Sequence, residues 1–149
     1  MKAMTEKRVA AEAQGQILLT DADQERLARM LRGVEGPQNS LYAYAMALKS
    51  EMDRASVVPA KEVPADVVTM NSRVKVRDVK TRKIETYVLV YPWEASSIED
   101  GLSVLAPIGT ALLGTRVGDV VSWRVPGGQR TLRVESVLYQ PEAAGQYDQ

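Results

Sequence analysis

The first stretch with a regular apolar pattern has the spacing of a helix. Its apolar residues recur every three or four positions, at Leu27, Met30, Leu31 and Val34. This spacing places them on one face of a helix from about Asp21 to Arg32. Thr20 stands where an N-cap residue belongs, and the acidic Asp23 favours the positive end of the helix dipole. We therefore expect a short extended segment at residues 17–19 that leads into this helix, which ends at Gly33.

A second helix is predicted from about residue 38 or 40 to residue 55. Its apolar residues alternate between four-residue and three-residue spacing, at Leu41, Ala45, Leu48, Met52 and Ala55. This is the pattern of a coiled-coil seam. A tight turn at residues 35–37 separates the two helices, which predicts an antiparallel hairpin. At about 1.5 Å per residue its arms are roughly 18 to 25 Å long, so the hairpin is short.

From Val67 onward the apolar pattern changes to alternation, and β-branched residues become frequent. Strands are predicted at residues 67–70, 73–77, 84–91, 101–106, 119–125 and 130–139. The last two flank Pro126-Gly127-Gly128, a strong hairpin signal. Residues 107–113 predict one short helix, which Gly114 closes. The fold class is therefore α+β: a short antiparallel N-terminal helical hairpin (coiled coil), then a mostly antiparallel β-sheet domain with one short helix.

These patterns divide the chain into five segments. They are a disordered N-terminal tail at 1–16, the hairpin at 17–58, a linker at 59–66, the sheet domain at 67–140 and a C-terminal tail at 141–149. No apolar run has the length needed to span a bilayer, and the mixed-charge start lacks the apolar core of a signal peptide. We therefore expect a cytoplasmic protein with no membrane partner.

The composition argues against most kinds of catalytic site. The 149 residues include no Cys and no His, which excludes disulfides, thiol nucleophiles, a histidine base and metal sites built on either residue. We therefore expect no metal, no cofactor and no enzymatic activity. The 19 basic residues balance the 19 acidic ones, so no net field favours nucleic acid, and no direct sequence-specific contact with nucleic acid is expected.

Residues 105–128 resemble the signature of the C-terminal domain of the Gre transcript-cleavage factors. The matching positions are Pro107-Ile108, Leu112-Leu113-Gly114, Asp119-Val120-Val121 and Pro126-Gly127-Gly128. A closer resemblance, which covers nearly everything from Ile17 onward, is to the Rnk family, the regulators of nucleoside diphosphate kinase. The segments that carry it are residues 51–55, 66–75, 89–92 and 139–145.

The resemblance implies an FKBP-like C-terminal domain and binding to core RNA polymerase near its secondary channel. It places the docking surface at Ala106, Pro107 and Ile108, where Gre factors carry Ser-Pro-Ile. Ala106 lacks the serine hydroxyl, which puts a polymerase hydrogen bond at this position in doubt. Arg116 is a candidate charge at the rim of this surface. An effect on nucleoside diphosphate kinase follows through transcription, and direct contact with that kinase is the alternative.

The hairpin tip differs from that of the Gre factors. Those proteins carry paired carboxylates on a long hairpin, which help to hold a catalytic Mg²⁺ inside the polymerase pore. The tip here, residues 32–39, offers the single carboxylate of Glu35 beside the polar Gln38 and Asn39. An arm of roughly 20 Å cannot deliver Glu35 to an active site deep inside the pore. We therefore expect competition with Gre factors without stimulated RNA cleavage.

Two other interpretations of the chain are open. An FKBP-like fold suggests a peptidyl-prolyl isomerase, but such a site needs a pocket lined by aromatic side chains and the chain contains no Phe. Alternatively, the outer ends of the hairpin stripe, with Tyr42, Tyr44 and Met46, would allow pairing with a second copy. A short hairpin on a stable domain satisfies its own apolar face, so we expect a monomer.

The two tryptophans have different surroundings in the pattern. Trp123 alternates with Val121 and Val125, which predicts that it packs on one face of the sheet. Trp93 follows Tyr91 and Pro92 in a loop, where it is either a solvated surface residue or an exposed anchor for a partner.

Overall fold

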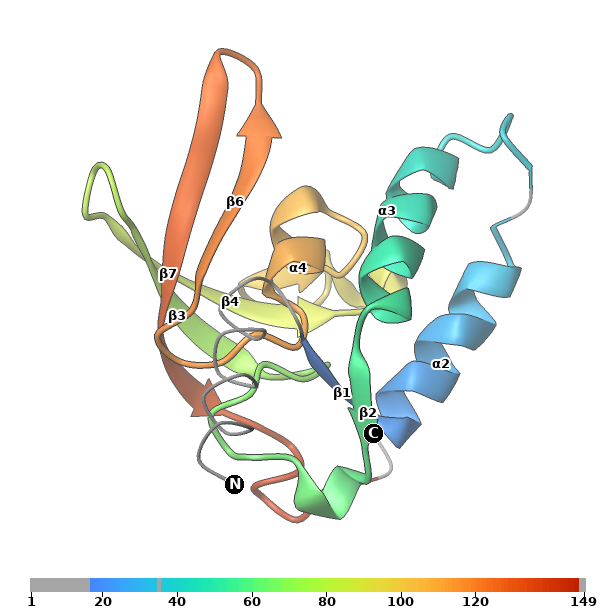
Figure 1. Ribbon diagram of the computed structural model, residues 1–149, viewed down its shortest axis with the longest axis horizontal. Helices are drawn as coiled ribbons and strands as arrows, with labels where there is room; N and C mark the ends of the chain where they lie inside the picture. Colours follow the sequence, from blue (N-terminus) through green and yellow to red (C-terminus); the bar gives the residue numbers. More distant parts are fainter. Residues whose placement is uncertain (1–16, 35, 148–149) are drawn as a thin grey trace, which may run out of the picture.

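The computed structural model describes residues 17–34 and 36–147, so the tail predicted at residues 1–16 lies outside the described part of the chain. The elements in chain order are β1 (Leu18–Thr20), α2 (Asp21–Arg32), α3 (Tyr42–Asp53), β2 (Ser56–Val58), η1 (Ala60–Glu62), β3 (Arg73–Asp78), β4 (Ile84–Val90), η2 (Pro92–Glu94), β5 (Gly101–Ser103), α4 (Pro107–Leu112), β6 (Val120–Val125) and β7 (Gly128–Tyr139). Figure 1 shows the helical hairpin beside a curled sheet and the short helix α4. The predicted α+β class is confirmed.

The main sheet has the strand order β5-β4-β3-β7-β6. Its pairs are antiparallel except for β4 and β5, which run parallel, so the sheet is mixed at this edge. The register of β3 against the long strand β7 shifts at two irregularities, and such bulges increase the local bend and twist. The predicted hairpin across the Pro-Gly-Gly turn is confirmed, since Val125 pairs with Gly128.

The strand predicted at residues 67–70 does not form. Val67 makes only an isolated bridge to Arg116. Val68 donates its amide to the Thr115 carbonyl at 2.8 Å and accepts the Gly114 amide at 2.8 Å. All four residues of the segment are nevertheless buried. The apolar run therefore reflects burial from all sides, and the chain turns at residues 69–72 before β3 begins.

The N-terminal hairpin is confirmed, with a later start to its second helix. Helix α2 has the predicted bounds, and the Thr20 hydroxyl caps it by accepting the Asp23 amide at 3.0 Å. Helix α3 begins at Tyr42. It starts there because residues 36–41 form turns, in which the Asn39 side chain accepts the Leu41 amide at 2.9 Å.

The hairpin and the sheet share one hydrophobic core. The hairpin and β1 contribute Leu19, Leu27, Ala45, Leu48 and Met52, and the rest of the chain contributes Val68, Met70, Val74, Val76, Leu89, Tyr91, Val104, Leu105, Leu112, Leu113, Leu132 and Val134. Helix α3 lies against α4 (Figure 1). At the outer end of the seam Leu41 is 41% exposed. The predicted seam therefore packs on the domain through its inner part.

The base of the hairpin is joined to the sheet domain at Gly114. Strand β1 pairs in parallel with β2, which closes the hairpin at its base. The Leu18 amide donates to the Gly114 carbonyl at 3.1 Å. Gly114 has a φ of +77°, and a Cβ there would lie 2.7 Å from both the Ile17 Cβ and the Leu18 carbonyl oxygen. Glycine is therefore required both by the backbone conformation and by the close approach of β1.

The segment predicted as a C-terminal tail folds back on the domain over residues 141–147. Gln140 is buried, and its side-chain amide donates to the carbonyls of Pro64 and Val67, each at 2.8 Å. The Thr69 hydroxyl donates to the Glu142 carboxylate at 2.7 Å. These contacts hold the end of the described chain against residues 64–69, which is the part that precedes β3.

We predict that Gly114→Ala destabilises the protein much more than Gly118→Ala. Both glycines have positive φ, but a Cβ at Gly118 meets no atom within 4 Å. The Gly118 variant should therefore lose about 1 kcal/mol from backbone strain alone. The Gly114 variant adds a backbone clash and should lose about 3 kcal/mol or more. Urea unfolding of both variants measures the difference, and equal losses would show that β1 does not press on Gly114.

Candidate functional site

The residues predicted to dock on a partner form the N-terminal end of α4. Ala106 holds the N-cap position, and its backbone carbonyl accepts the Thr110 amide at 2.8 Å. Pro107 follows in the first turn, where its fixed φ suits a helix start, and its side chain is exposed. Ile108 is half-buried and packs against the core. Of the three predicted residues, Pro107 thus offers the accessible surface.

Helix α4 is pressed closely onto the end of β5. A Cβ at Gly109 would lie 2.1 Å from the Ser103 carbonyl oxygen, which only a glycine avoids. The Thr110 hydroxyl donates to the Val104 carbonyl at 2.6 Å. These contacts fix the position of Pro107 relative to the sheet. A glycine inside a helix is unfavourable unless a close approach requires it; sequence reasoning did not use this signal at Gly109.

A groove of about 400 Å³ lies beside Pro107, between α3, α4 and β6. Its walls are formed by Tyr44, Ala47, Ser50, Glu51, Arg54, Leu105, Pro107, Thr110, Ala111, Ser122 and Trp123. Trp123 is half-buried and packs against the core, as the alternation in β6 predicts. The short helix α4, the hairpin and the sheet therefore all contribute to one concave surface.

Arg130 supports the Trp123 side of this groove. Its guanidinium lies 5.9 Å from the centre of the Trp123 ring, and β7 places it directly opposite Trp123 in the register. The guanidinium also pairs with Asp78 at 3.2 Å and with Glu85. The Thr81 amide and then Arg130 hold the pKa of Asp78 below its usual value. Both acids therefore remain charged near neutral pH and keep Arg130 in place.

Arg116 does not join the residues at the start of α4. It lies beyond the other end of the helix, where its side chain contacts Asp66 at 3.4 Å. Its backbone amide donates to the Asp119 carboxylate at 2.9 Å. The structure thus engages Arg116 in the loop between α4 and β6, and it does not line the groove beside Pro107.

Of the predicted tip residues, Gln38 and Asn39 belong to the connection between α2 and α3, at the outer end of the hairpin (Figure 1). Gln38 is exposed, and Asn39 uses its side chain within the turn that starts α3. Glu35 lies outside the described residues. Gln38 and Asn39 line neither the groove beside Pro107 nor the cavity between α2 and η2. The tip is therefore a separate part of the surface.

Asp23 is a buried acid that sequence reasoning assigned only to the helix dipole. It is 3% exposed, and its Oδ2 accepts the Met70 amide at 3.0 Å. Burial, opposed mainly by this hydrogen bond, raises the pKa of Asp23 to about 6. The residue joins the first turn of α2 to the segment before β3. No local signal marks it, because its partner lies 47 residues further along the chain.

Two family models together cover nearly all of the described chain. Residues 63–139 match the model of the transcription elongation factor GreA/GreB C-terminal region, and residues 16–58 match the Rnk N-terminus. This chain belongs to the GreA/GreB family. Within it, the chain is 46% identical over 132 residues to the regulator of nucleoside diphosphate kinase from Escherichia coli K12, covering 88% of this chain and 95% of the relative. Within the GreA/GreB family, this chain therefore belongs to the group that includes this regulator.

Elongation factors are also among its relatives. The chain is 31% identical over 104 residues to the transcription elongation factor GreA of Syntrophus aciditrophicus, covering 70% of this chain and 65% of that protein. A GreA/GreB elongation factor from Nitrosomonas europaea has the same fold, with a TM-score of 0.66, 36% identity and coverage of 83% and 98%. At the family level the protein is a Gre-like regulator, and its relatives are named as regulators and elongation factors rather than as enzymes.

Within residues 17–34 and 36–147, no helix combines the length and the apolar character needed to cross a membrane.

We predict that Asp23→Asn removes part of the pH dependence of stability. The pKa of Asp23 is about 6 in the fold and 3.8 in its ordinary state. Ionisation therefore disfavours the fold, and stability from this group is lost as pH rises from about 4 to about 6. Between pH 4 and pH 7 the variant should gain up to about 3 kcal/mol of unfolding free energy relative to the parent.

Urea unfolding at a series of pH values measures this gain. Asp21→Asn is the matched control, because Asp21 is exposed in the same helical turn. This control measures the effect of removing an exposed carboxylate from the same turn. Parallel profiles for the parent and the Asp23 variant would contradict a buried, ionisable contact between α2 and residue 70.

Proposed function

We propose that this protein is a transcription regulator that binds core RNA polymerase near its secondary channel and excludes Gre factors without stimulating transcript cleavage. Membership of the GreA/GreB family supports the choice of partner. An effect on nucleoside diphosphate kinase, the property that the Escherichia coli relative is named for, follows as a consequence of altered transcription.

The accessible end of α4 supports a docking surface on the C-terminal domain. Pro107 is exposed there, and the close contact of Gly109 with β5 fixes its position. The neighbouring groove joins α4 to α3 and β6 and ends in a half-buried tryptophan. Aromatic side chains in such concave surfaces commonly contribute much of the binding energy of a protein interface. We place the polymerase contact on Pro107 and this groove.

The proposed lack of cleavage activity rests on one observation: the hairpin is short and packs into the core of the domain. Its helices have 12 residues each, which corresponds to about 18 Å. Its inner apolar residues, including Leu27 and Leu48, are fully buried in the core shared with the sheet. The arm therefore cannot extend from the domain without exposing that core, and its tip sequence supplies the single carboxylate of Glu35.

We predict that Pro107→Glu weakens binding to core RNA polymerase about tenfold, since a charge placed in a desolvated contact is unfavourable. Pro126→Glu is the matched control, because Pro126 is also exposed but lies in the β6–β7 turn. Both variants should fold, since neither proline is buried. Binding is measured by fluorescence anisotropy of the labelled protein titrated with core polymerase.

Two further measurements complete the test. Excess Gre factor should displace the parent protein from polymerase, and stalled elongation complexes should show no added RNA cleavage when the protein is present. Stimulated cleavage would contradict the argument from the short hairpin. Equal binding of the two proline variants would refute the docking surface, and the absence of any binding would refute the choice of partner.

A further inference from the structure

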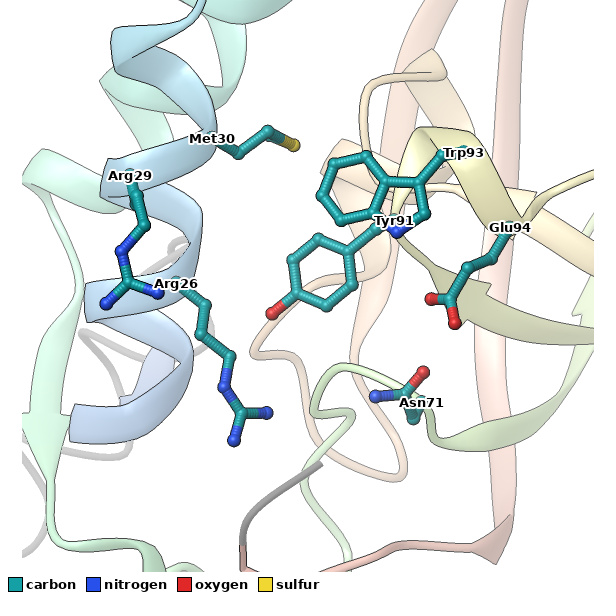
Figure 2. Close-up of a pocket in the computed structure, with 7 residues that line it drawn as sticks. All are labelled: Arg26, Arg29, Met30, Asn71, Tyr91, Trp93 and Glu94. Carbon is teal, nitrogen blue, oxygen red and sulfur yellow. The ribbon is translucent and has the colours of Figure 1, made fainter.

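A second cavity, of about 510 Å³, lies on the other side of the hairpin, between α2 and the end of β4. Its walls are Arg26, Arg29, Met30, Asn71, Tyr91, Trp93 and Glu94. Figure 2 shows Met30 and Arg26 of α2 directed across this space toward Tyr91, which follows β4, and toward Trp93 and Glu94 of η2. The volume is in the range of small-molecule sites, which usually combine apolar walls with a few polar groups. Neither the docking surface nor the hairpin tip uses this cavity.

One wall is a stacked aromatic pair. The rings of Tyr91 and Trp93 lie 5.1 Å apart with 9° between their planes. Tyr91 is 6% exposed and Trp93 is 68% exposed, so the buried ring supports a largely open indole. The Met30 side chain points across the cavity toward that indole (Figure 2). A thioether opposite an indole makes a flat apolar slot suited to a planar ring.

The hydroxyl group of Tyr91 is buried and has no hydrogen-bond partner among residues 17–34 and 36–147. Buried polar groups in proteins almost always have a partner, so this hydroxyl requires an explanation. It points toward α2 beside Arg26 and Arg29 (Figure 2). Burial raises the pKa of Tyr91 above its ordinary value, which keeps the proton on the oxygen. The group is therefore a buried, unsatisfied donor at the α2 side of the cavity, and it suits an oxygen acceptor.

The α2 side of the cavity is cationic. Arg26 makes no ion pair or hydrogen bond with any described residue. Arg29 contacts Glu25 at 3.1 Å, but both side chains are more than 60% exposed, so this pair is weak and easily exchanged. Glu94 is the acid in the opposite wall, and the buried Asp23 lies close enough to act on both Arg26 and Tyr91. The two arginines favour an anionic group on their side of the cavity and Glu94 disfavours one opposite, while the Asp23 charge, present above about pH 6, reduces the attraction at the arginine side.

We propose that this cavity binds a nucleoside phosphate, with the base stacked on Trp93 and the phosphate held by Arg26 and the Tyr91 hydroxyl. A guanidinium and a phenolic hydroxyl both donate to phosphate oxygens. The carboxylate of Glu94 and the amide of Asn71 offer acceptors for donors on the base or the ribose. This site is independent of the proposed docking on polymerase and uses different residues.

Isothermal titration calorimetry of the full chain with ADP and with GDP tests the proposal directly. We expect saturable binding of one nucleotide per chain, about tenfold tighter than the binding of adenosine or of pyrophosphate alone, because each lacks one half of the contacts. Trp93→Ala and Arg26→Gln should each weaken nucleotide binding about tenfold. Tyr91→Phe, which keeps the ring and removes the donor, should weaken it about fivefold.

Arg32→Gln and Trp123→Phe are the matched controls. Arg32 is an exposed cation at the end of the same helix, and Trp123 lies in the other groove. Both controls should bind nucleotide as the parent does. The absence of saturable binding would overturn the proposal, as would equal affinity for pyrophosphate and ADP, or equal losses in the Arg26 and Arg32 variants. Because polymerase is not present, failure here would leave the proposed docking unaffected.

Discussion

The structure depends on the contact between the N-terminal hairpin and the sheet domain. At its centre the buried Asp23 carboxyl accepts the Met70 amide at 3.0 Å, and the Leu18 amide donates to the Gly114 carbonyl at 3.1 Å. Removing one partner of a buried hydrogen bond leaves the other unsatisfied, which costs more than the bond contributes. These two contacts therefore fix where the hairpin meets the sheet domain, and the shared hydrophobic core packs α2 and α3 onto the sheet around them.

Two surfaces of the molecule follow from the placement of the hairpin. Helix α3 forms a wall of the groove beside Pro107. Helix α2 forms a wall of the cavity beside Trp93. The hairpin thus shapes concave surfaces close to the domain. A longer arm would reach further, but here the inner part of each helix is committed to the core. Because the inner apolar residues of both helices are held in the core, we expect the protein to bind polymerase without carrying a catalytic acid into the pore.

Local signals in the sequence were sufficient for the local structure. The three-and-four spacing with Thr20 before it predicted α2 to the residue, and Pro-Gly-Gly predicted the β6–β7 turn. The strand expected at residues 67–70 was wrong because those side chains are buried by distant segments. The two cavities could not be predicted, since each combines residues from the hairpin with residues more than 30 positions away. The prediction that Pro107 contacts a partner rests on a family resemblance, and the structure shows that its side chain is exposed.

Native-state hydrogen exchange tests most directly whether the hairpin and the sheet form one cooperative unit. The amides of Leu18, Met70 and the inner turns of α3 should exchange with the same opening free energy as those of β3 and β7, because all of them surround one core. That result would mean that the arm cannot leave the domain while the sheet remains folded. Exchange of the α3 and Met70 amides through a much cheaper opening, with the sheet still protected, would contradict the account.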